Sequence, residues 1–88
     1  GGITFDPYSY EFNEYLKEKI RNRDNRICQN CNKTEIENGR KLTVHHIDYN
    51  KQNCDEINLI TLCNSCNAKA NKNRDYWKEY YINKLKGI

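Results

Sequence analysis

Residues Leu59–Cys66 read LITLCNSC, a short apolar run that leads directly into two cysteines separated by two residues. A bounded run of four apolar and β-branched residues is typical of a buried strand, and a helical pattern follows it through about Lys72. The same cysteine spacing occurs upstream at Cys28 and Cys31. Two cysteines at this spacing form a tight turn, a knuckle, and two knuckles present four thiolates to one tetrahedral ion. The sequence therefore predicts a structural zinc site formed by Cys28, Cys31, Cys63 and Cys66.

The remaining cysteine, Cys54, has no partner at this spacing, and we expect it to act as a small buried hydrophobic residue. An odd number of cysteines, without an apolar leader segment, favours metal ligation in a reducing compartment over disulfides. A redox role for the cysteine pairs, or four unpaired thiols, are the alternatives to zinc.

The composition points to one small domain that needs such a brace. The chain has 88 residues, of which 31% are charged and only 36% are hydrophobic. A core of this size rarely stabilises a fold alone, so we expect one domain over residues 1–88. Residues 1–8 are expected to lie outside its ordered part. The longest uncharged apolar stretch, Ile57–Cys63, is far shorter than the roughly 20 residues of a membrane span, so we expect no membrane contact. The reducing compartment that the cysteines favour is expected to be the cytoplasm.

Periodicity predicts an α+β arrangement with a helix at each end. The first helix is expected to begin at a cap on Asp6 or Ser9 and to end near Asp24. The final helix is expected over Asp75–Lys86, with an aromatic face that packs against the first helix rather than stacking on bases. Between the helices we expect two strands, Lys41–Ile47 and Leu59–Leu62, joined by a loop rich in turn-forming residues.

Basic residues cluster in two segments, although the net charge is only +3. Lys17–Arg26 and Lys69–Lys86 are each predominantly basic and bracket a nearly neutral middle. Such segments are either solvated helix faces or surfaces for a polyanion.

The two histidines of the chain, His45 and His46, are adjacent at the end of the first predicted strand. Consecutive side chains on a regular strand point to opposite faces. Either only one histidine therefore serves a site, or the strand ends or bulges so that both converge. An imidazole is suited to metal ligation or to general-base catalysis, and a structural role is the alternative.

The sequence LTVHHID at Leu42–Asp48, followed by EINLITLCNSCN at Glu56–Asn67, resembles the motif of HNH endonucleases, the ββα-metal or His-Me finger nucleases. It is similar in particular to the small zinc-containing members often found in phages, where an Arg-Asp pair such as Arg23-Asp24 precedes the first cysteine knuckle. The resemblance covers roughly Tyr10–Trp77. It implies two strands and a helix around one divalent ion, with the four-cysteine zinc as a separate brace.

This resemblance implies a role for each matching residue. His45 and Asn67 would bind the catalytic ion, His46 would be the general base that activates water, and Asn58 would hold the loop between the strands and orient the base. The family commonly has His where this chain has Asn67. An amide oxygen is a hard, neutral ligand that suits Mg²⁺ or Mn²⁺, and a site without a carboxylate is expected to bind its ion weakly until DNA arrives.

The activity that the resemblance implies is metal-dependent hydrolysis of DNA to 5′-phosphate and 3′-hydroxyl ends, in a bacterial or phage-infected cell. Double-stranded DNA is the expected partner, bound through phosphates by the basic residues Arg74, Lys72, Lys69, Arg23 and Arg26. A monomer or weak homodimer is expected, which leaves nicking and double-strand cleavage both open.

Two other classes of function compete with this interpretation. A non-catalytic zinc module that binds nucleic acid or protein would share the zinc and the basic faces, but it would not need His46, Asn58 and Asn67 in register. An oxidoreductase would use the cysteine pairs, but the strand and helix pattern expected around them is missing.

Overall fold

The fold is built on two short strands, and the computed structural model describes residues 8–86 of the chain. Strand β1 (Thr43–His46) pairs antiparallel with β2 (Leu59–Leu62). The register places His45 opposite Ile60 and His46 opposite Leu59. The second strand has its predicted bounds, whereas the first is shorter than the predicted Lys41–Ile47.

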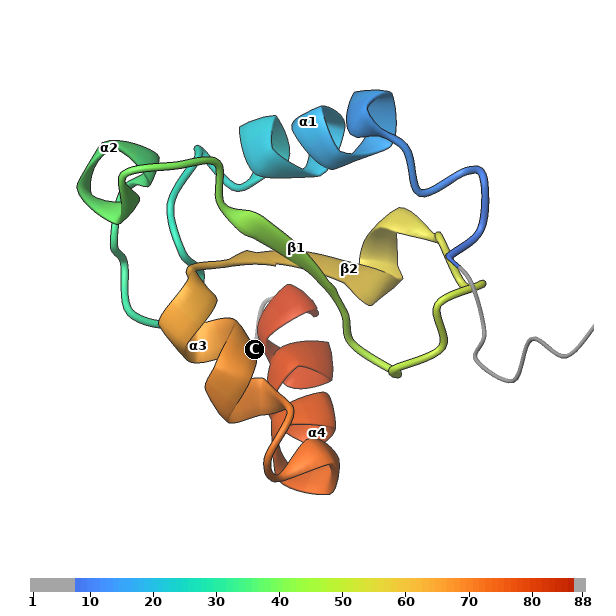
Figure 1. Cartoon of the computed structure of the whole chain (residues 1–88). Helices are drawn as coiled ribbons and strands as arrows, with labels where there is room; N and C mark the ends of the chain where they lie inside the picture. The colour runs from blue at the N-terminus through green and yellow to red at the C-terminus, as the bar shows by residue number, and fades with distance from the viewer. Residues whose placement is uncertain (1–7, 87–88) are drawn as a thin grey trace, which may run out of the picture.

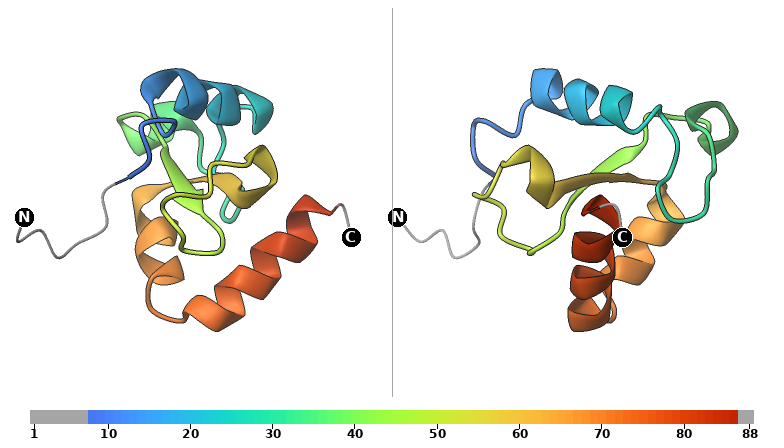
Figure 2. Two further views of the ribbon diagram at one scale, coloured as in Figure 1. Left: turned by 90° about the vertical axis from the view of Figure 1, so that its right-hand side faces the viewer. Right: turned by 180° about the vertical axis from the view of Figure 1, so that it is seen from behind.

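Helices cover both faces of this sheet (Figure 1). Helix α1 (Glu14–Arg23) lies on one face, and α3 (Asn64–Ala70) and α4 (Arg74–Leu85) lie on the other. The turned views of Figure 2 show the same separation of the helices by the sheet. The order of β1, β2 and α3 gives the ββα unit that the sequence predicts, and the α+β fold class with flanking helices is confirmed.

Each face of the sheet has its own apolar cluster. On the α1 face, Ile20 packs with Val44 and Leu59, and Phe12 and Leu16 cover them. The larger cluster on the other face surrounds Tyr81 and includes three of the four paired cysteines; its members are Cys28, Leu42, Ile47, Ile60, Leu62, Cys63, Cys66, Ala70 and Tyr81. The cysteine site is therefore continuous with the main core.

Two sequence expectations about the terminal helices are wrong. Helix α1 begins at Glu14, because the side chain of Asn13 caps it by accepting a hydrogen bond from the Leu16 N–H at 3.0 Å. Ser9 instead accepts from the N–H of Glu11, in a turn before the helix. Of the residues predicted to lie outside the ordered part, 1–7 fall outside the described residues, as does the proposed cap Asp6.

The aromatic residues of α4 do not pack against α1, since the sheet lies between the two helices (Figure 1). Tyr81 is fully buried in the cluster beside the cysteines, and Trp77 packs against that cluster. Tyr76 and Tyr80 remain exposed on the outer side. The error arose because helical periodicity identifies an apolar face but not the element that it meets.

Two short helical turns were not predicted. The single turn α2 (Glu35–Asn38) has a capping box between Thr34 and Glu37 and ends at Gly39, whose φ of +78° favours glycine. The 3₁₀ turn η1 (Glu56–Asn58) leads directly into β2. No helix within residues 8–86 is both long and apolar enough to cross a membrane.

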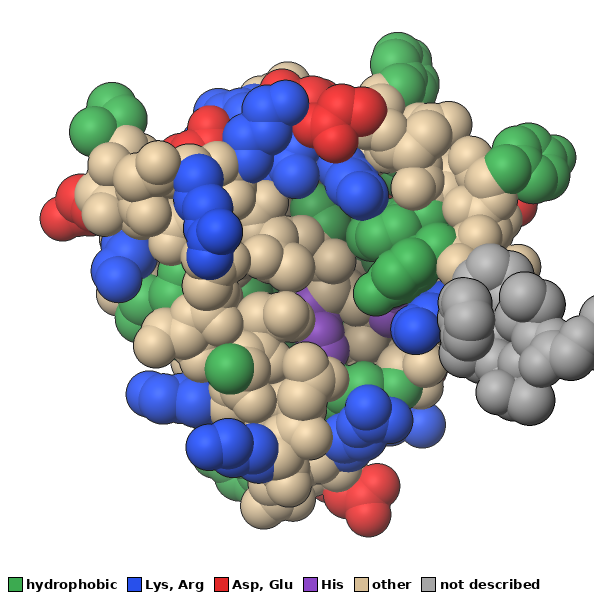
Figure 3. All heavy atoms as spheres, viewed as in Figure 1, with side chains coloured by type: hydrophobic (Ala, Val, Ile, Leu, Met, Phe, Trp, Pro, Cys, Tyr) green, Lys and Arg blue, Asp and Glu red, His purple; other side chains and the backbone are tan. Residues whose placement is uncertain are grey.

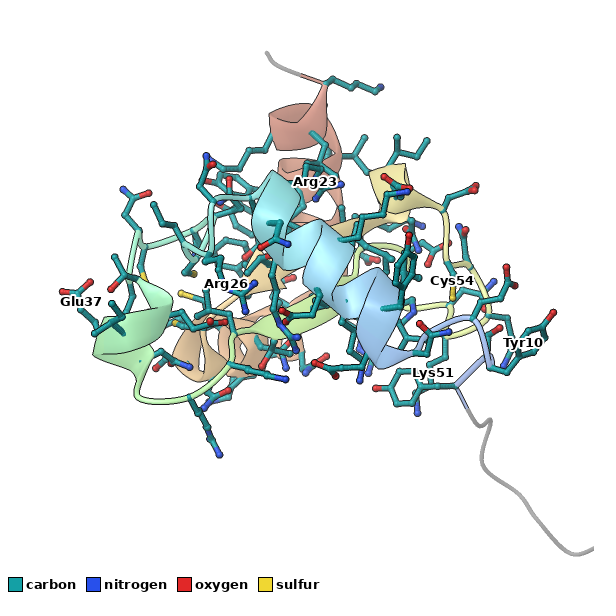
Figure 4. The ribbon with its side chains drawn as sticks, turned by 90° about the horizontal axis from the view of Figure 1, so that it is seen from above. Tyr10, Arg23, Arg26, Glu37, Lys51 and Cys54 are labelled. Carbon is teal, nitrogen blue, oxygen red and sulfur yellow. The ribbon has the colours of Figure 1, made fainter. Side chains whose placement is uncertain are left out.

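Arg23 and Asp24 fasten the end of α1 to β2. The buried carboxylate of Asp24 accepts from the Thr61 N–H at 3.0 Å and pairs with Arg23 at 2.9 Å. Arg23 also donates to the carbonyl oxygens of Glu56 and Leu59, each at 2.6 Å. The Arg-Asp pair therefore holds β2 in place beneath α1, and Figure 4 shows Arg23 at this end of the helix.

Candidate functional site

The four paired cysteines come together as predicted. Their sulfur atoms all lie within 4.8 Å of one another, and Sγ of Cys31 is 3.7 Å from Sγ of Cys63. A tetrahedral zinc with bonds of about 2.3 Å places its sulfur ligands about 3.8 Å apart, so the observed separation fits such an ion. The structure thus confirms a cysteine cluster that is positioned to hold a metal ion.

Local backbone structure presents these thiols. In the first knuckle the Cys28 N–H donates to the Lys33 carbonyl oxygen and the Asn32 N–H donates to that of Cys28, with Asn32 at a φ of +67°. In the second knuckle Cys63 caps α3, and its sulfur accepts from the Cys66 N–H at 3.5 Å. Both knuckles are rigid turns, which preorganises the ligands for one ion.

The thiols differ in acidity because the site is crowded. Burial opposes ionisation of Cys63, but hydrogen bonds from the Cys66 N–H and the neighbouring thiols outweigh burial and lower the pKa of Cys63 to about 7. Burial, with hydrogen bonds to the other thiols, raises the pKa of Cys66 to about 12. Four thiolates in this space therefore require a cation among them, as a structural zinc site provides.

Cys54 lies apart from this cluster, in the loop between the strands. It is half-buried and lines a separate hollow with Tyr10, Tyr15 and Leu16. Burial raises the pKa of its thiol. The cysteine cluster therefore contains four of the five cysteines, and Cys54 is only partly buried where the sequence predicts a buried residue.

The adjacent histidines face opposite sides of the sheet yet line one hollow. His45 points toward α3 and α4, and His46 points toward α1, as strand alternation requires. Both side chains reach the hollow that opens at the unpaired edge of β1, which Asn67, Arg74 and Lys51 also line. In Figure 3 the histidines appear at the bottom of a hollow with basic side chains around it. Convergence therefore needs no bulge, because among residues 8–86 only β2 pairs with β1, which leaves its other edge open, and β1 ends at His46.

His45 is held between helix α3 and the loop after β1. Its Nδ1 lies 3.1 Å from Oδ1 of Asn67, and Tyr49 contacts its ring edge with centroids 5.1 Å apart. Burial lowers the pKa of His45 to about 4, so the imidazole is neutral at physiological pH. The buried Nε2 atom has no partner among the described residues. A neutral imidazole and the amide oxygen beside its Nδ1 are a fitting pair of ligands for a divalent ion.

The distance between Nδ1 of His45 and Oδ1 of Asn67 tests whether both atoms can bind one ion. Octahedral ligands about 2.1 Å from Mg²⁺ lie about 3 Å apart at neighbouring positions. The 3.1 Å between Nδ1 of His45 and Oδ1 of Asn67 agrees with this spacing. The same contact is a direct hydrogen bond when Nδ1 carries the proton.

His46 is enclosed by aromatic rings on the α1 side. Its centroid lies 4.4 Å from that of Phe12 and 5.6 Å from that of Tyr8. Burial lowers the pKa of His46, and although Asp48 opposes this, Lys51 and Lys17 add to it. No described residue forms a hydrogen bond with its Nε2. The ring is therefore neutral and held by packing, and its buried Nε2 has a hydrogen-bonding capacity that no described residue uses.

Asn58 holds the loop that follows β1. Its amide oxygen accepts from the Asp48 N–H at 3.0 Å, and its amide nitrogen donates to the Asp48 carboxylate and to the Asn53 carbonyl oxygen, both at 2.9 Å. Asp48 also accepts hydrogen bonds from Asn50 and Asn53. These contacts fix the chain directly after His46, and they identify Asp48 as a loop-holding acid.

The predicted DNA-contacting residues occupy different environments. Arg74 lines the histidine hollow, 4.6 Å above the ring of Tyr49, while Lys69 is exposed on α3 and Lys72 is exposed in the turn that follows α3. Arg23 and Arg26 lie outside this hollow. Arg23 is engaged with Asp24 and two carbonyl oxygens, and Arg26 binds Glu18, Glu35 and Asn22 (Figure 4). Both therefore serve the fold, and a DNA contact by either stays a prediction.

Sequence reasoning missed four residues of the hollow: Tyr8, Tyr49, Lys51 and Asn71. Tyr49 has a φ of +64°, uncommon for a bulky residue, and its hydroxyl donates to the Ala70 carbonyl oxygen at the end of α3. Lys51 lies 4.9 Å from the ring centroid of Tyr8. No local sequence pattern marks these residues, because tertiary structure brings them to the site from separate segments of the chain.

These features define the class of protein. Two antiparallel strands and a helix surround a histidine pair, and a four-cysteine cluster braces the unit, as in a ββα-metal finger. The family description "HNH endonuclease" matches residues 28–73, which include both knuckles, His45, His46, Asn58 and Asn67. The chain belongs to the HNH endonuclease family. Comparison with curated proteins gave no match, and comparison with solved structures gave none either.

Proposed function

We propose that this protein is a metal-dependent DNA endonuclease that uses His46 as its general base. The observation that carries the proposal is the convergence of His45, His46 and Asn67 in one hollow within the matched family region. We further propose zinc for the cysteine cluster and Mg²⁺ or Mn²⁺ for His45 and Asn67. Double-stranded DNA is the proposed substrate, and hydrolysis leaves 5′-phosphate and 3′-hydroxyl ends.

The residues of the chain divide the work of hydrolysis. His46, neutral at physiological pH, accepts the proton of the attacking water, and Asn58 keeps the backbone after His46 in place. Arg74 and Lys51 attract the phosphate at the rim of the hollow. A divalent ion bound by His45 and Asn67 would stabilise charge on the phosphate and the leaving 3′ oxygen.

Plasmid cleavage tests this assignment. Zinc-loaded wild type and His46→Ala are incubated with supercoiled plasmid in Mg²⁺, in Mn²⁺ and without added divalent ion. We expect divalent-dependent cleavage that falls by at least about 100-fold in His46→Ala, because general-base catalysis contributes 10²–10⁴-fold. Zinc content and circular dichroism check the fold of the variant. Activity of His46→Ala within about threefold of wild type would refute the role of His46.

The metal ligands have a separate readout. His45→Ala and Asn67→Ala should raise the Mg²⁺ concentration needed for half-maximal cleavage, because each removes one protein ligand. Asn83→Ala, on the exposed part of α4, is the matched control for Asn67→Ala. An unchanged Mg²⁺ titration would exclude the two residues as ligands.

The same plasmid assay addresses stoichiometry and the rival function. A monomer with one site should accumulate nicked circles before linear DNA, whereas a dimer with two sites should produce linear DNA early. No cleavage of any form by well-folded, zinc-loaded wild type would favour a non-catalytic zinc module instead.

A further inference from the structure

A second hollow adjoins the histidine hollow along the unpaired edge of β1. The two share Tyr8, Thr43 and Val44 in their walls, so they form one continuous depression. We call the second hollow the α1–β1 groove; its polar rim consists of Lys17, Arg21, Arg40, Lys41 and Asn64. The groove therefore leads away from His46 between α1 and β1.

The cations of this surface differ in how far acids neutralise them. Arg21 is buried and bonded to Glu14 and Glu18, and Lys41 pairs with Glu14 at 3.0 Å. Lys17 and Arg40 form no ion pair with any carboxylate of residues 8–86. The same holds for Lys51 and Arg74 in the histidine hollow. Four cations without an ion pair in the described residues thus flank one depression. Figure 3 shows basic side chains around the hollow that contains the histidines.

These cations are held in place by neighbouring side chains. The Lys17 ammonium lies 4.7 Å from the ring centroid of Phe12, as Lys51 and Arg74 lie over Tyr8 and Tyr49. With its amide oxygen directed at Arg40, Asn64 accepts from Nε of Arg40 at 2.6 Å and donates to Oγ1 of Thr43 at 3.1 Å. Cations that are positioned before binding lose less conformational entropy when an anion arrives.

We propose that the α1–β1 groove binds the phosphates of the cleaved DNA strand on one side of the scissile bond, through Lys17 and Arg40. This inference rests on the proposed nuclease function and extends the substrate contact beyond the reacting phosphate. The groove offers two cations without an ion pair in the described residues, so the contact covers about two phosphates of one strand. Phosphate contacts of this kind fix the register of the strand without reading its sequence.

Charge neutralisation in the substrate tests the proposal directly. A short duplex carries phosphorothioates at every position of the labelled strand except one, which confines cleavage to a known bond. A neutral methylphosphonate is then introduced at one further position at a time, and kcat/KM is measured for wild type and for the double variant Lys17→Gln/Arg40→Gln. Lys78→Gln/Lys84→Gln removes two charges from exposed positions of α4 that line neither hollow and is the matched control.

For wild type we expect kcat/KM to fall by about fivefold at each of about two consecutive positions on one side of the bond, the size of a modest charge contact. Lys17→Gln/Arg40→Gln should have a lower kcat/KM on the unsubstituted duplex, and a methylphosphonate at those positions should not lower it further. The control variant should behave as wild type. Equal sensitivity of wild type and Lys17→Gln/Arg40→Gln at every position would overturn the proposal.

Binding measurements separate this inference from the nuclease function. Fluorescence anisotropy with unmodified duplex at several salt concentrations should give a slope of log affinity against log salt that is shallower by about two in Lys17→Gln/Arg40→Gln. Lys78→Gln/Lys84→Gln should leave the slope unchanged. If zinc-loaded wild type binds DNA with this pattern but cleaves no substrate, the nuclease proposal fails and the groove contact stands. If wild type cleaves but the slopes of all variants agree, the groove contact fails alone.

Discussion

The ring centroids of Phe12 and His46 lie 4.4 Å apart, with the ring planes inclined at 53°. Phe12 comes from the turn before α1, whereas His46 ends β1, so this contact joins the N-terminal segment to the proposed general base. No described residue forms a hydrogen bond with Nε2 of His46, and aromatic packing therefore fixes how the ring faces the hollow. Phe12 is a positioning residue in this arrangement.

Replacing Phe12 by Leu should impair catalysis more than binding. The smaller side chain still covers Ile20 and Val44 but lets the imidazole of His46 rotate, and misplacing a catalytic group by about 1 Å costs up to 10²-fold. We expect kcat to fall by about tenfold or more, with KM within about twofold of wild type.

Phe12→Tyr is the matched control because it keeps the ring, and its kcat should stay within about threefold of wild type. Melting temperatures of both variants show whether the fold is intact. A kcat for Phe12→Leu equal to that of wild type would show that the ring does not orient His46.

The cysteine cluster predicts a clear difference between two serine substitutions. Cys66→Ser removes one of four ligands from the core and should lower zinc content below half an equivalent, with loss of helical circular dichroism because α3 depends on the site. Cys54→Ser should retain about one equivalent, because Cys54 lies outside the cluster. Zinc is measured by atomic emission after purification without chelator. Loss of zinc in both variants would mean that Cys54 takes part in the site.

Local patterns in the sequence identified the parts of the fold that are determined locally. The apolar run of Leu59–Leu62, the two cysteine spacings and the alternation of His45 and His46 depend on neighbouring residues, and the structure has each of them as predicted. The cap of α1 was wrong because Asp6, Ser9 and Asn13 are all good capping residues, and tertiary packing selected Asn13.

The partners of charged and aromatic residues could not be predicted in this way. Arg23 and Arg26 belong to a basic segment in sequence, yet their guanidinium groups bind acids and carbonyl oxygens that are distant along the chain. Tyr49 and Lys51 reach the hollow only because Asn58 closes the loop between the strands. Long-range pairing of this kind leaves no periodic signal in a single sequence.

Asp24 should contribute strongly to stability although it is remote from the histidine hollow. Its buried carboxylate accepts from the Thr61 N–H and from Arg23, so Asp24→Asn weakens the pairing with Arg23 and leaves the amide nitrogen facing donors. We expect a loss of about 2 kcal/mol, which corresponds to a drop of about 10 °C in Tm for a domain of this size. The exposed Glu79→Gln on α4 is the control and should change the free energy of unfolding by less than about 0.5 kcal/mol. Similar melting temperatures for Asp24→Asn and Glu79→Gln would contradict this role.

Glu18 should make the stability of the protein sensitive to acid. Hydrogen bonds from Arg26 and Arg21 lower the pKa of Glu18 from 4.5 to about 2. A carboxylate with a depressed pKa in the folded state stabilises the fold fully above its unfolded pKa, and this contribution is lost as pH falls from about 4.5 toward 2. Glu18→Gln removes the contribution at every pH. The Tm of wild type should therefore exceed that of Glu18→Gln above about pH 5, and the difference should shrink as the buffer becomes more acidic.

Acid also releases zinc from thiolates, but it does so in both proteins, so the difference between their melting temperatures isolates Glu18. Thermal melts followed by circular dichroism between neutral and strongly acidic pH measure this difference. Glu79→Gln, which lacks arginine partners in the described structure, should differ from wild type by the same small amount throughout. A difference between wild type and Glu18→Gln that stays constant with pH would show that the two arginines do not stabilise the ionised carboxylate.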